Sequence, residues 1–374
     1  MLFKDVIAQD ELKKQLKATI VNRKVSHAQL FSGNEGCGHF AMALAYTQFL
    51  LCTNKKEDSC GECSSCLKLQ QLSHPDVHFS FPVQLAKANK VESSDDLITP
   101  FREMVGPSAY IGFSKWNNIQ GNKNKQGIIA VKESEAIIKK LSLKSFEGGY
   151  KVLIMWLPEQ MNKEAANKLL KLIEEPPKET LFIFVSDQPE KIIDTILSRL
   201  QRINFSNLPA NKIEEALVDR YNIDSQQAAS IATLADGSFH RALTLTKQDN
   251  NVDFYLTEFV NWMRLCYSRN ISDTIDWVDH MAASGREKQK EFLLFTLEMF
   301  RQSILGHYSK GTLTVLSSDQ QQFLNKFSPF INHLNIVGLN EVINQAYYHL
   351  ERNANPKILL LDVSLKIYAL LKKQ

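Results

Sequence analysis

The sequence lacks a strong excess of charge of either sign. Its 374 residues include 44 Lys and Arg against 41 Asp and Glu, and the formal net charge is +3. Whole-molecule charge therefore does not predict a nucleic-acid-binding protein. Any contact with DNA would have to come from a local patch or from partner proteins.

Long apolar runs are absent as well. No stretch approaches the roughly 18 consecutive apolar residues of a membrane span. The first residues, MLFKDVIAQDELKKQL, lack the apolar core of a signal peptide. We therefore expect a cytoplasmic protein that has no membrane partner. In that reducing compartment, clustered cysteines indicate a metal site before they indicate disulfides.

Glycine and proline are not concentrated in any segment, which argues against a disordered or fibrous chain. The composition, with 44% hydrophobic and 23% charged residues, is that of a globular protein. A length of 374 residues predicts two or three domains, because domains average about 100–200 residues.

Short apolar runs that alternate with helical segments predict a buried parallel α/β sheet. The five predicted strands are residues 28–31, 77–83, 151–157, 181–185 and 201–205. Asp5 is expected to cap a first helix. Residues 161–175 predict an amphipathic helix that Pro176 and Pro177 end.

The second half of the chain reads as helical throughout. We expect a sheet domain at 1–207, with an insertion of loops and short helices at about 84–126, a three-helix lid at 208–249 and an all-α domain at 250–374. Four helical segments are expected in the last domain, at 252–267, 286–308, 335–353 and 356–373. Phe259, Trp262 and Tyr267 fall at helical spacing, which predicts core positions.

The stretch GNEGCGHF, residues 33–40, stands between an apolar strand and a helix, where a phosphate-binding loop would be. Such a loop reads G-x-x-x-x-G-K-[ST], and its Lys and hydroxyl contact phosphate and Mg²⁺. Glycines are present as Gly33, Gly36 and Gly38. His39 and Phe40, however, stand at the positions of the lysine and of the hydroxyl residue. Neither substitute can do the same work.

Four of the six cysteines, Cys52, Cys60, Cys63 and Cys66, lie within one short segment. Four thiolates are the right number and kind of ligand for tetrahedral Zn²⁺, and a closed four-cysteine site is structural, not catalytic. Disulfides or an iron–sulfur cluster are the alternatives. Cys37 and Cys266 are isolated and are expected to be small core residues.

Taken together, these motifs resemble the delta-prime family of bacterial DNA polymerase III clamp-loader subunits. The resemblance covers nearly the whole chain outside the insertion, and it is carried by DVIAQDELKKQL, SHAQLFSGNEGCG, the four-cysteine segment, LSHPDVH, MNKEAANKLLKLIEEPPKETLFIFVSD, TILSRLQRINF, DGSFHRALTL and ERNANPKILL.

The resemblance implies an AAA+ sheet domain, a helical lid and a C-terminal helical collar used for oligomerisation. It implies a fixed place in a five-subunit ring with gamma/tau-type ATPase subunits and a delta subunit. DNA and the sliding clamp would be met through the assembled complex. The chain would be a component of the polymerase holoenzyme that does not itself hydrolyse ATP.

The resemblance also implies roles for particular residues. Trp156 and Leu157 stand where active relatives carry their metal-holding and water-activating acids, and only Glu159 follows. Ser198 and Arg199 match a family motif whose arginine acts in trans on ATP held by a neighbour, although Leu200 replaces the motif's cysteine. Further matches, at a polar sensor position and at a lid arginine, are Ser186, Asp187 and Arg241.

Two other functions remain open from the sequence. One is an active AAA+ ATPase with divergent motifs, which ATP turnover by the isolated chain would favour. The other is a zinc-dependent DNA-binding protein, which needs a basic, salt-sensitive surface. The charge-balanced stretch TNKKEDSCGEC does not supply that surface.

Overall fold

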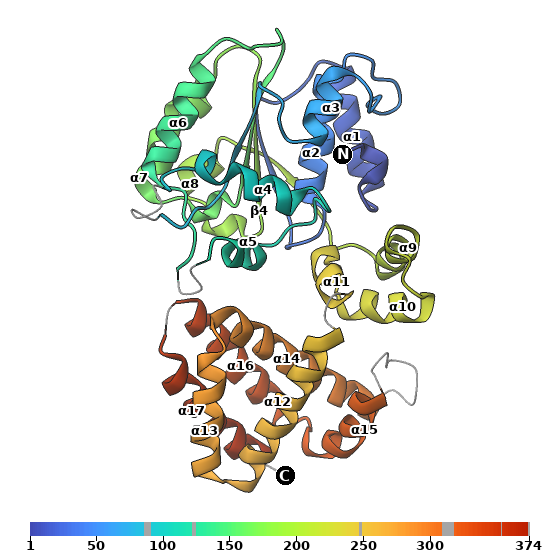
Figure 1. Ribbon diagram of the computed structural model, residues 1–374, viewed down its shortest axis with the longest axis vertical. Coiled ribbons are helices and arrows are strands. Elements are labelled where there is room, and N and C mark those ends of the chain that lie inside the picture. The colour runs from blue at the N-terminus through green and yellow to red at the C-terminus, as the bar shows by residue number, and fades with distance from the viewer. Residues whose placement is uncertain (86–90, 122–124, 247–248, 309–317, 353, 373–374) are drawn as a thin grey trace. The chain divides into compact units, whose positions relative to one another are not determined.

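A parallel sheet of five strands organises the first part of the chain (Figure 1). The structure is a computed structural model that describes all residues except 86–90, 122–124, 247–248, 309–317, 353 and 373–374. The chain divides into two units, Met1–Leu243 and Thr244–Gln374. Among the described residues, no helix is long and apolar enough to cross a membrane.

All five predicted strands are present, and the sheet order is β2-β3-β4-β1-β5 with every pair parallel. The carboxyl ends of parallel strands meet at one edge of a sheet, where α/β proteins bind their ligands. The loops after β1, β3 and β4 therefore converge. The strands are β1 (Ala28–Ser32), β2 (Val77–Ser80), β3 (Lys151–Trp156), β4 (Thr180–Ser186) and β5 (Gln201–Asn204).

Helices cover both faces of the sheet (Figure 1). Because side chains alternate along a strand, Leu153 and Met155 face α6 and α7 within one core cluster, whereas Trp156 contacts Phe40 of α2 on the opposite face. One side carries α1 (Asp10–Val21), α2 (His39–Leu51) and α3 (Ser64–Gln70), and the other carries α6 (Val131–Ser142), α7 (Lys163–Glu174) and α8 (Asp194–Leu197).

The helix predicted at 161–175 is confirmed as α7, whose first turn is capped by the Asn162 side chain accepting the Ala165 N–H at 2.8 Å. The cap predicted at Asp5 is wrong. Asp5 closes a separate 3-10 turn, η1 (Phe3–Asp5), by accepting the Leu2 N–H at 2.8 Å. Ala8 and Gln9 then have positive φ, so the first helix starts afresh at Asp10.

The described part of the insertion consists of loops and short helices, as expected, and it joins the core. Phe101 stacks on Phe81 with ring centroids 3.9 Å apart, and Trp116 Nε1 donates to the Pro82 carbonyl at 2.6 Å. The segment includes η2 (Ser94–Leu97), α4 (Ile98–Val105) and α5 (Phe113–Ile119). The insertion is therefore an integral layer beyond the end of β2.

Three amphipathic helices follow the sheet: α9 (Ala210–Tyr221), α10 (Ser225–Leu234) and α11 (Phe239–Thr246). The Asp224 side chain caps α10 by accepting the Gln226 N–H at 3.0 Å. Two 3-10 turns, η3 (Pro158–Gln160) and η4 (Pro189–Lys191), follow β3 and β4.

The second unit is entirely helical where it is described. Phe259 and Trp262 are fully buried, as predicted, whereas Tyr267 is 52% exposed and its core assignment is wrong. The helices are α12 (Asp249–Ser268), α13 (Ile271–Ala283), α14 (Arg286–Tyr308), α15 (Ser318–Phe327) and, after η5 (Ser328–Phe330), α16 (Ile336–Glu351) and α17 (Pro356–Leu371).

Two of these helices, α13 and α15, were missed by sequence reasoning. A signal for α13 was present, because the Asn270 side chain caps it by accepting the Asp273 N–H. Trp277 of α13 stacks on Trp262 with centroids 5.0 Å apart, and Trp262 Nε1 donates to Ser364 Oγ of α17 at 2.7 Å. The missed helix α13 is thus central to the core of this unit.

The buried carboxylate of Asp76 holds the loop that leads into β3. It accepts the N–H groups of Phe146 and Glu147 at 2.6 and 2.8 Å and the Ser145 hydroxyl at 3.2 Å. The Phe146 side chain itself is 81% exposed. The conformation of this loop therefore depends on the Asp76 carboxylate and not on packing of Phe146, the largest side chain of the loop.

We predict that Asp76→Ala lowers the free energy of unfolding of the first unit by about 2–3 kcal/mol, because it leaves donors of charge-assisted hydrogen bonds without an acceptor. Thermal unfolding measures the loss, and hydrogen exchange should locate it at the Phe146 and Glu147 amides. Ser145→Ala is the control, because it removes the 3.2 Å bond to Asp76 and the bond from the Gly149 N–H but keeps both amide bonds to the carboxylate. Unchanged exchange at both amides in Asp76→Ala would contradict the anchoring role.

Candidate functional site

The Gly-rich loop keeps the path of a phosphate-binding loop. It follows β1 and ends at the N-terminus of α2, and Gly36 and Gly38 adopt φ values of 81° and 97° that favour glycine. At such a helix start, backbone N–H groups attract anions. The backbone is therefore preserved although the functional side chains have changed.

His39, at the position of the phosphate-binding lysine, is 3% exposed and points into the protein. Its Nε2 lies 2.7 Å from Oδ1 of Asp187, and the Phe40 N–H donates to its Nδ1 at 3.0 Å. The Phe40 amide favours a ring without a proton on Nδ1. Burial also lowers the pKa of His39, but Cys37 and Asp187 outweigh burial and raise it to about 10. Asp187 accepts a hydrogen bond from Nε2 whether the His39 ring is neutral or protonated.

Phe40, which the motif pattern aligns with a Mg²⁺-binding hydroxyl, packs against Trp156, which the resemblance aligns with a metal-holding acid. The rings of Phe40 and Trp156 lie edge to face with centroids 6.2 Å apart, and both side chains are 2% exposed or less. Phe101 of the insertion contacts both rings, at 6.1 and 5.9 Å. The rings of Phe40, Trp156 and Phe101 thus form one buried aromatic cluster.

The remaining acid after β3, Glu159, has a structural position. Its Oε1 accepts the N–H groups of Asp187 and Gln188 at 3.0 and 3.1 Å, which ties the loop after β3 to the loop after β4. Burial and the nearby Asp187 raise the pKa of Glu159 to about 7. Leu157, which replaces the second acid, is 2% exposed.

The structure brings His39, Phe40, Trp156 and Asp187 together at the carboxyl edge of the sheet. Sequence reasoning singled out all four positions but did not predict the pairing of His39 with Asp187. The pairing follows from the order of the strands, because β1 and β4 are neighbours.

Arg199 lies elsewhere, after α8, among the helices on the other side of the sheet. Its Nε donates to Glu174 Oε1 of α7 at 2.6 Å, and its Nη1 donates to the Thr195 carbonyl at 2.5 Å and to Ser198 Oγ at 3.4 Å. The Arg199 side chain is 35% exposed. Arg241 is on α11, where its backbone N–H donates to Ser238 Oγ at 3.2 Å.

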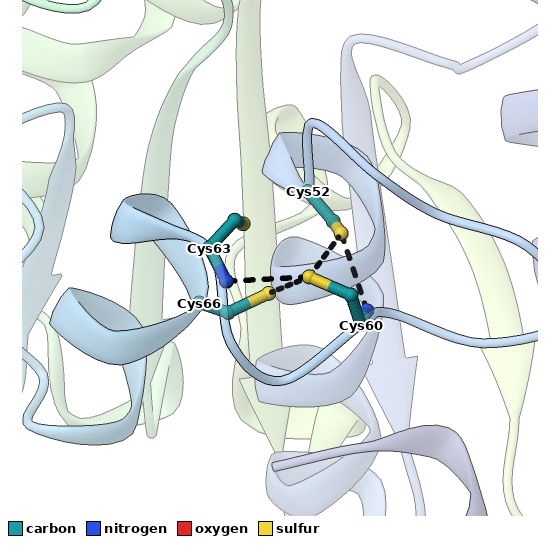
Figure 2. Close-up of side chains that lie close together, drawn as sticks. All are labelled: Cys52, Cys60, Cys63 and Cys66. Carbon is teal, nitrogen blue, oxygen red and sulfur yellow. Dashed lines mark hydrogen bonds between the residues drawn. The ribbon is translucent and has the colours of Figure 1, made fainter.

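The four clustered cysteines converge on one point (Figure 2). Their Sγ atoms all lie within 4.8 Å of one another, with Cys52 to Cys60 at 3.6 Å and Cys60 to Cys66 at 3.9 Å. Ligands about 2.3 Å from a tetrahedral Zn²⁺ would be about 3.8 Å apart. Cys52 ends α2, and Cys63 and Cys66 lie at the start and in the middle of α3.

The chemistry of the cluster also fits a cation. The N–H groups of Cys60 and Cys63 point at the sulfurs of Cys52 and Cys60, each at 3.3 Å, and such bonds stabilise thiolates. Burial raises the pKa values of Cys52 and Cys66. It also acts to raise that of Cys63, but there hydrogen bonds from Cys66 and Thr53 outweigh burial and lower the pKa to about 6. All six cysteines are free. The four-cysteine cluster could therefore hold one metal ion.

The four-cysteine segment is linked to the loop that precedes β3 through Glu147. Its Oε2 accepts the Ser65 hydroxyl at 2.9 Å and lies 3.1 Å from His74 Nε2, while Lys68 forms an ion pair with the same carboxylate. Ser65 and Lys68 flank Cys66 on α3. A change at the cluster would therefore reach the loop that precedes β3.

The sheet order, the Gly-rich loop before α2 and the three helices that follow define an AAA+-type domain whose phosphate loop is closed by its own side chains. Residues 8–209 match the family described as "DNA polymerase III, delta subunit". The chain belongs to the delta-prime family of DNA polymerase III clamp-loader subunits.

Curated relatives are named as delta' and tau subunits of DNA polymerase III. The chain is 25% identical over 348 residues to the Escherichia coli DNA polymerase III subunit delta', covering 91% of this chain and 88% of that one. It is 26% identical over 244 residues to the Bacillus subtilis subunit delta', covering 65% and 57%. It is 24% identical over 384 residues to the Bacillus subtilis subunit tau, covering 95% and 59%. The match thus spans less than two thirds of either Bacillus protein.

Solved structures resemble the chain more loosely. A DNA polymerase III gamma subunit-related protein from Thermotoga maritima is 16% identical, with a TM-score of 0.36 and coverage of 95% of this chain and 98% of that chain.

We predict that the purified chain contains one metal ion and that Cys60→Ser and Cys63→Ser each lose most of it, because a three-thiolate site is open and weaker. Elemental analysis measures the content. Cys266→Ser, which changes a buried cysteine of the second unit, is the control and should keep the metal. Full metal content in both cluster variants would place the ligands elsewhere.

Proposed function

We propose that this chain is a non-hydrolysing delta-prime-like subunit of a replicative clamp loader. The contact between Phe40 and Trp156 is the observation that carries the proposal, because each ring replaces a Mg²⁺ ligand of active P-loop enzymes and the two rings fill the same space. The binding of His39 to Asp187 supports it, since no side chain at that position is available to phosphate.

The proposed partners are gamma/tau-type ATPase subunits and a delta subunit in a five-subunit ring, with DNA and the sliding clamp met through the assembled complex. Relatives named subunit delta' and subunit tau support this assignment. The second unit is proposed as the oligomerisation collar, and α9–α11 as the lid. A structural role is proposed for Arg241.

Arg199, next to Ser198, is proposed as an arginine finger that reaches the γ-phosphate of ATP held by the neighbouring subunit. In the isolated chain its guanidinium is occupied by Glu174. The pair is partly exposed, and exposed ion pairs contribute only about 0.2–1 kcal/mol. A phosphate, which accepts a bidentate bond from the planar guanidinium, could therefore displace Glu174.

The metal of the four-cysteine cluster is proposed to be a structural Zn²⁺, one per chain. Four thiolates around one ion leave no open position for catalysis. The spacing of the sulfurs also suits a single ion better than a multi-iron cluster, whose cysteines bind separate iron atoms. Zinc would hold the end of α2 and the start of α3 together.

We predict that the isolated chain shows no ATP hydrolysis above background in the presence of Mg²⁺ and DNA, because its Mg²⁺ position is filled by Phe40 and Trp156. Phosphate release by the purified protein is the measurement. Turnover that disappears in a His39→Ala variant would mean that the chain's own loop is active, and would favour the divergent ATPase over the proposed function.

We predict that Arg199→Ala leaves the ring assembled but impairs DNA-stimulated ATPase and clamp loading. Loss of an arginine finger typically lowers turnover by about 10³–10⁵ at its own site. Other intact sites in the ring should make the overall drop in ATPase smaller than the defect in loading. A complex reconstituted with the variant chain tests both activities.

Two matched variants separate the finger from the local ion pair. Arg199→Lys should rescue loading only in part, because an ammonium lacks the planar fork. Glu174→Gln weakens the same ion pair but leaves the guanidinium in place, and it should load clamps normally. Normal loading with Arg199→Ala would reduce the subunit to a scaffold, and an equal defect in Glu174→Gln would show that the pair acts only by stabilising the fold.

A further inference from the structure

A tyrosine of the insertion lies at the junction of three parts of the first unit. Tyr110, in the loop between α4 and α5, is 4% exposed. It contacts the segment before α1, the Gly-rich loop and helix α11, although these are far apart in the sequence. None of the residue roles derived above uses this side chain.

The ring lies directly against the Gly-rich loop. A Cβ added at Gly38, the residue that begins α2, would come within 3.1 Å of Cε1 and 3.3 Å of the hydroxyl oxygen of Tyr110. The ring of Tyr110 therefore packs directly on the backbone just before the first turn of α2.

The hydroxyl group fixes the N-terminal segment. It accepts the backbone N–H of Ile7 at 2.7 Å, a hydrogen bond that spans 103 residues and is fully buried. Ile7 is 4% exposed, and a buried N–H without an acceptor is costly. Tyr110 thus supplies the acceptor that this segment requires.

The opposite side of Tyr110 holds helix α11. Its ring lies edge to face with Phe239, with centroids 5.0 Å apart, and its carbonyl lies 3.2 Å from His240 Nδ1. A carbonyl only accepts, so this nitrogen carries the proton. The Phe239 N–H in turn donates to the Gly36 carbonyl at 3.0 Å, which joins α11 to the loop.

We propose that Tyr110 is an internal ligand: its side chain takes the place of a small aromatic ligand beside the closed phosphate loop and pins α11 to the sheet domain. The inference deepens the proposed function, on which it rests for the closed phosphate loop. A lid that a side chain holds does not respond to nucleotide. The sequence predicts no role for the insertion, and this inference assigns one to it.

Hydrogen exchange of the full chain tests the proposal. In Tyr110→Ala, the amides of α11 and above all the Phe239 N–H should exchange at least tenfold faster, as should the Ile7 N–H. Tyr46→Ala is the matched control, because Tyr46 is equally buried and hydrogen-bonded to Thr19 and Gln29 but does not contact α11. Unchanged α11 exchange in Tyr110→Ala, or an equal rise in Tyr46→Ala, would overturn the proposal.

Chemical rescue tests whether the space left by Tyr110→Ala binds an aromatic ring. p-Cresol, which reproduces the tyrosine side chain, should restore the slow exchange of α11 in Tyr110→Ala, since cavities left by truncated side chains bind ligands of the missing shape. Toluene should restore it less well and should not protect Ile7. Failure of p-cresol at saturating concentration to slow exchange would count against an internal ligand.

Two further measurements test the proposal even if the Tyr110→Ala variant does not fold. Tyr110→Phe keeps the ring, so it should speed exchange of Ile7 tenfold or more while leaving α11 protected. In the wild-type chain, millimolar ATP should leave α11 exchange unchanged, and protection of α11 by ATP would overturn the proposal. These readouts do not use clamp loading, so a failure of the proposed clamp-loader role would leave them standing.

Discussion

The contact between Phe40 and Trp156 is the constraint on which the ligand edge of this sheet depends. In an active P-loop enzyme the corresponding positions carry polar ligands that require a metal and water between them. Here two rings meet across the same gap, and Phe101 completes the cluster. Aromatic pairs of this geometry contribute about 0.5–1.5 kcal/mol each beyond their buried area. Under the proposed function, the edge that usually stays open for a ligand is part of the core in this chain.

Closing this edge determines what the remaining polar groups do. Most buried polar groups in proteins are paired, and several at this edge pair with one another, although Trp156 Nε1 and Glu159 Oε2 have no partner among the described residues. His39 binds Asp187, and Glu159 accepts the amides that follow β4. Restoring a lysine at position 39 alone would place an ammonium beside Asp187 and leave the Mg²⁺ position filled.

Most patterns that are local in the sequence predict the structure correctly, whereas contacts between distant segments are not predictable from them. The five strands, α7 and the convergence of the cysteines follow from apolar runs, a proline stop and close spacing. The prediction omits helix α13, although the capping residue Asn270 marks its start. The core assignment of Tyr267 is wrong because helical spacing alone does not show which residues at the margin of an apolar face are buried. The hydrogen bond between Tyr110 and Ile7 spans 103 residues, so no local sequence pattern could predict it.

The two sides of the sheet differ in a way that bears on a ring of subunits. On the α2 side the groups that would act on a ligand of this chain are buried and bound to one another. On the α8 side Arg199 stays partly exposed, and its ion-pair partner Glu174 is itself 44% exposed. An exposed pair can be exchanged at little cost, whereas a buried cluster cannot. If Arg199 acts in trans as proposed, the same chain has a rigid interior where it has no ligand and an adaptable surface where its neighbour's ligand would be. Such a subunit could take part in a neighbour's hydrolysis without changing its own conformation.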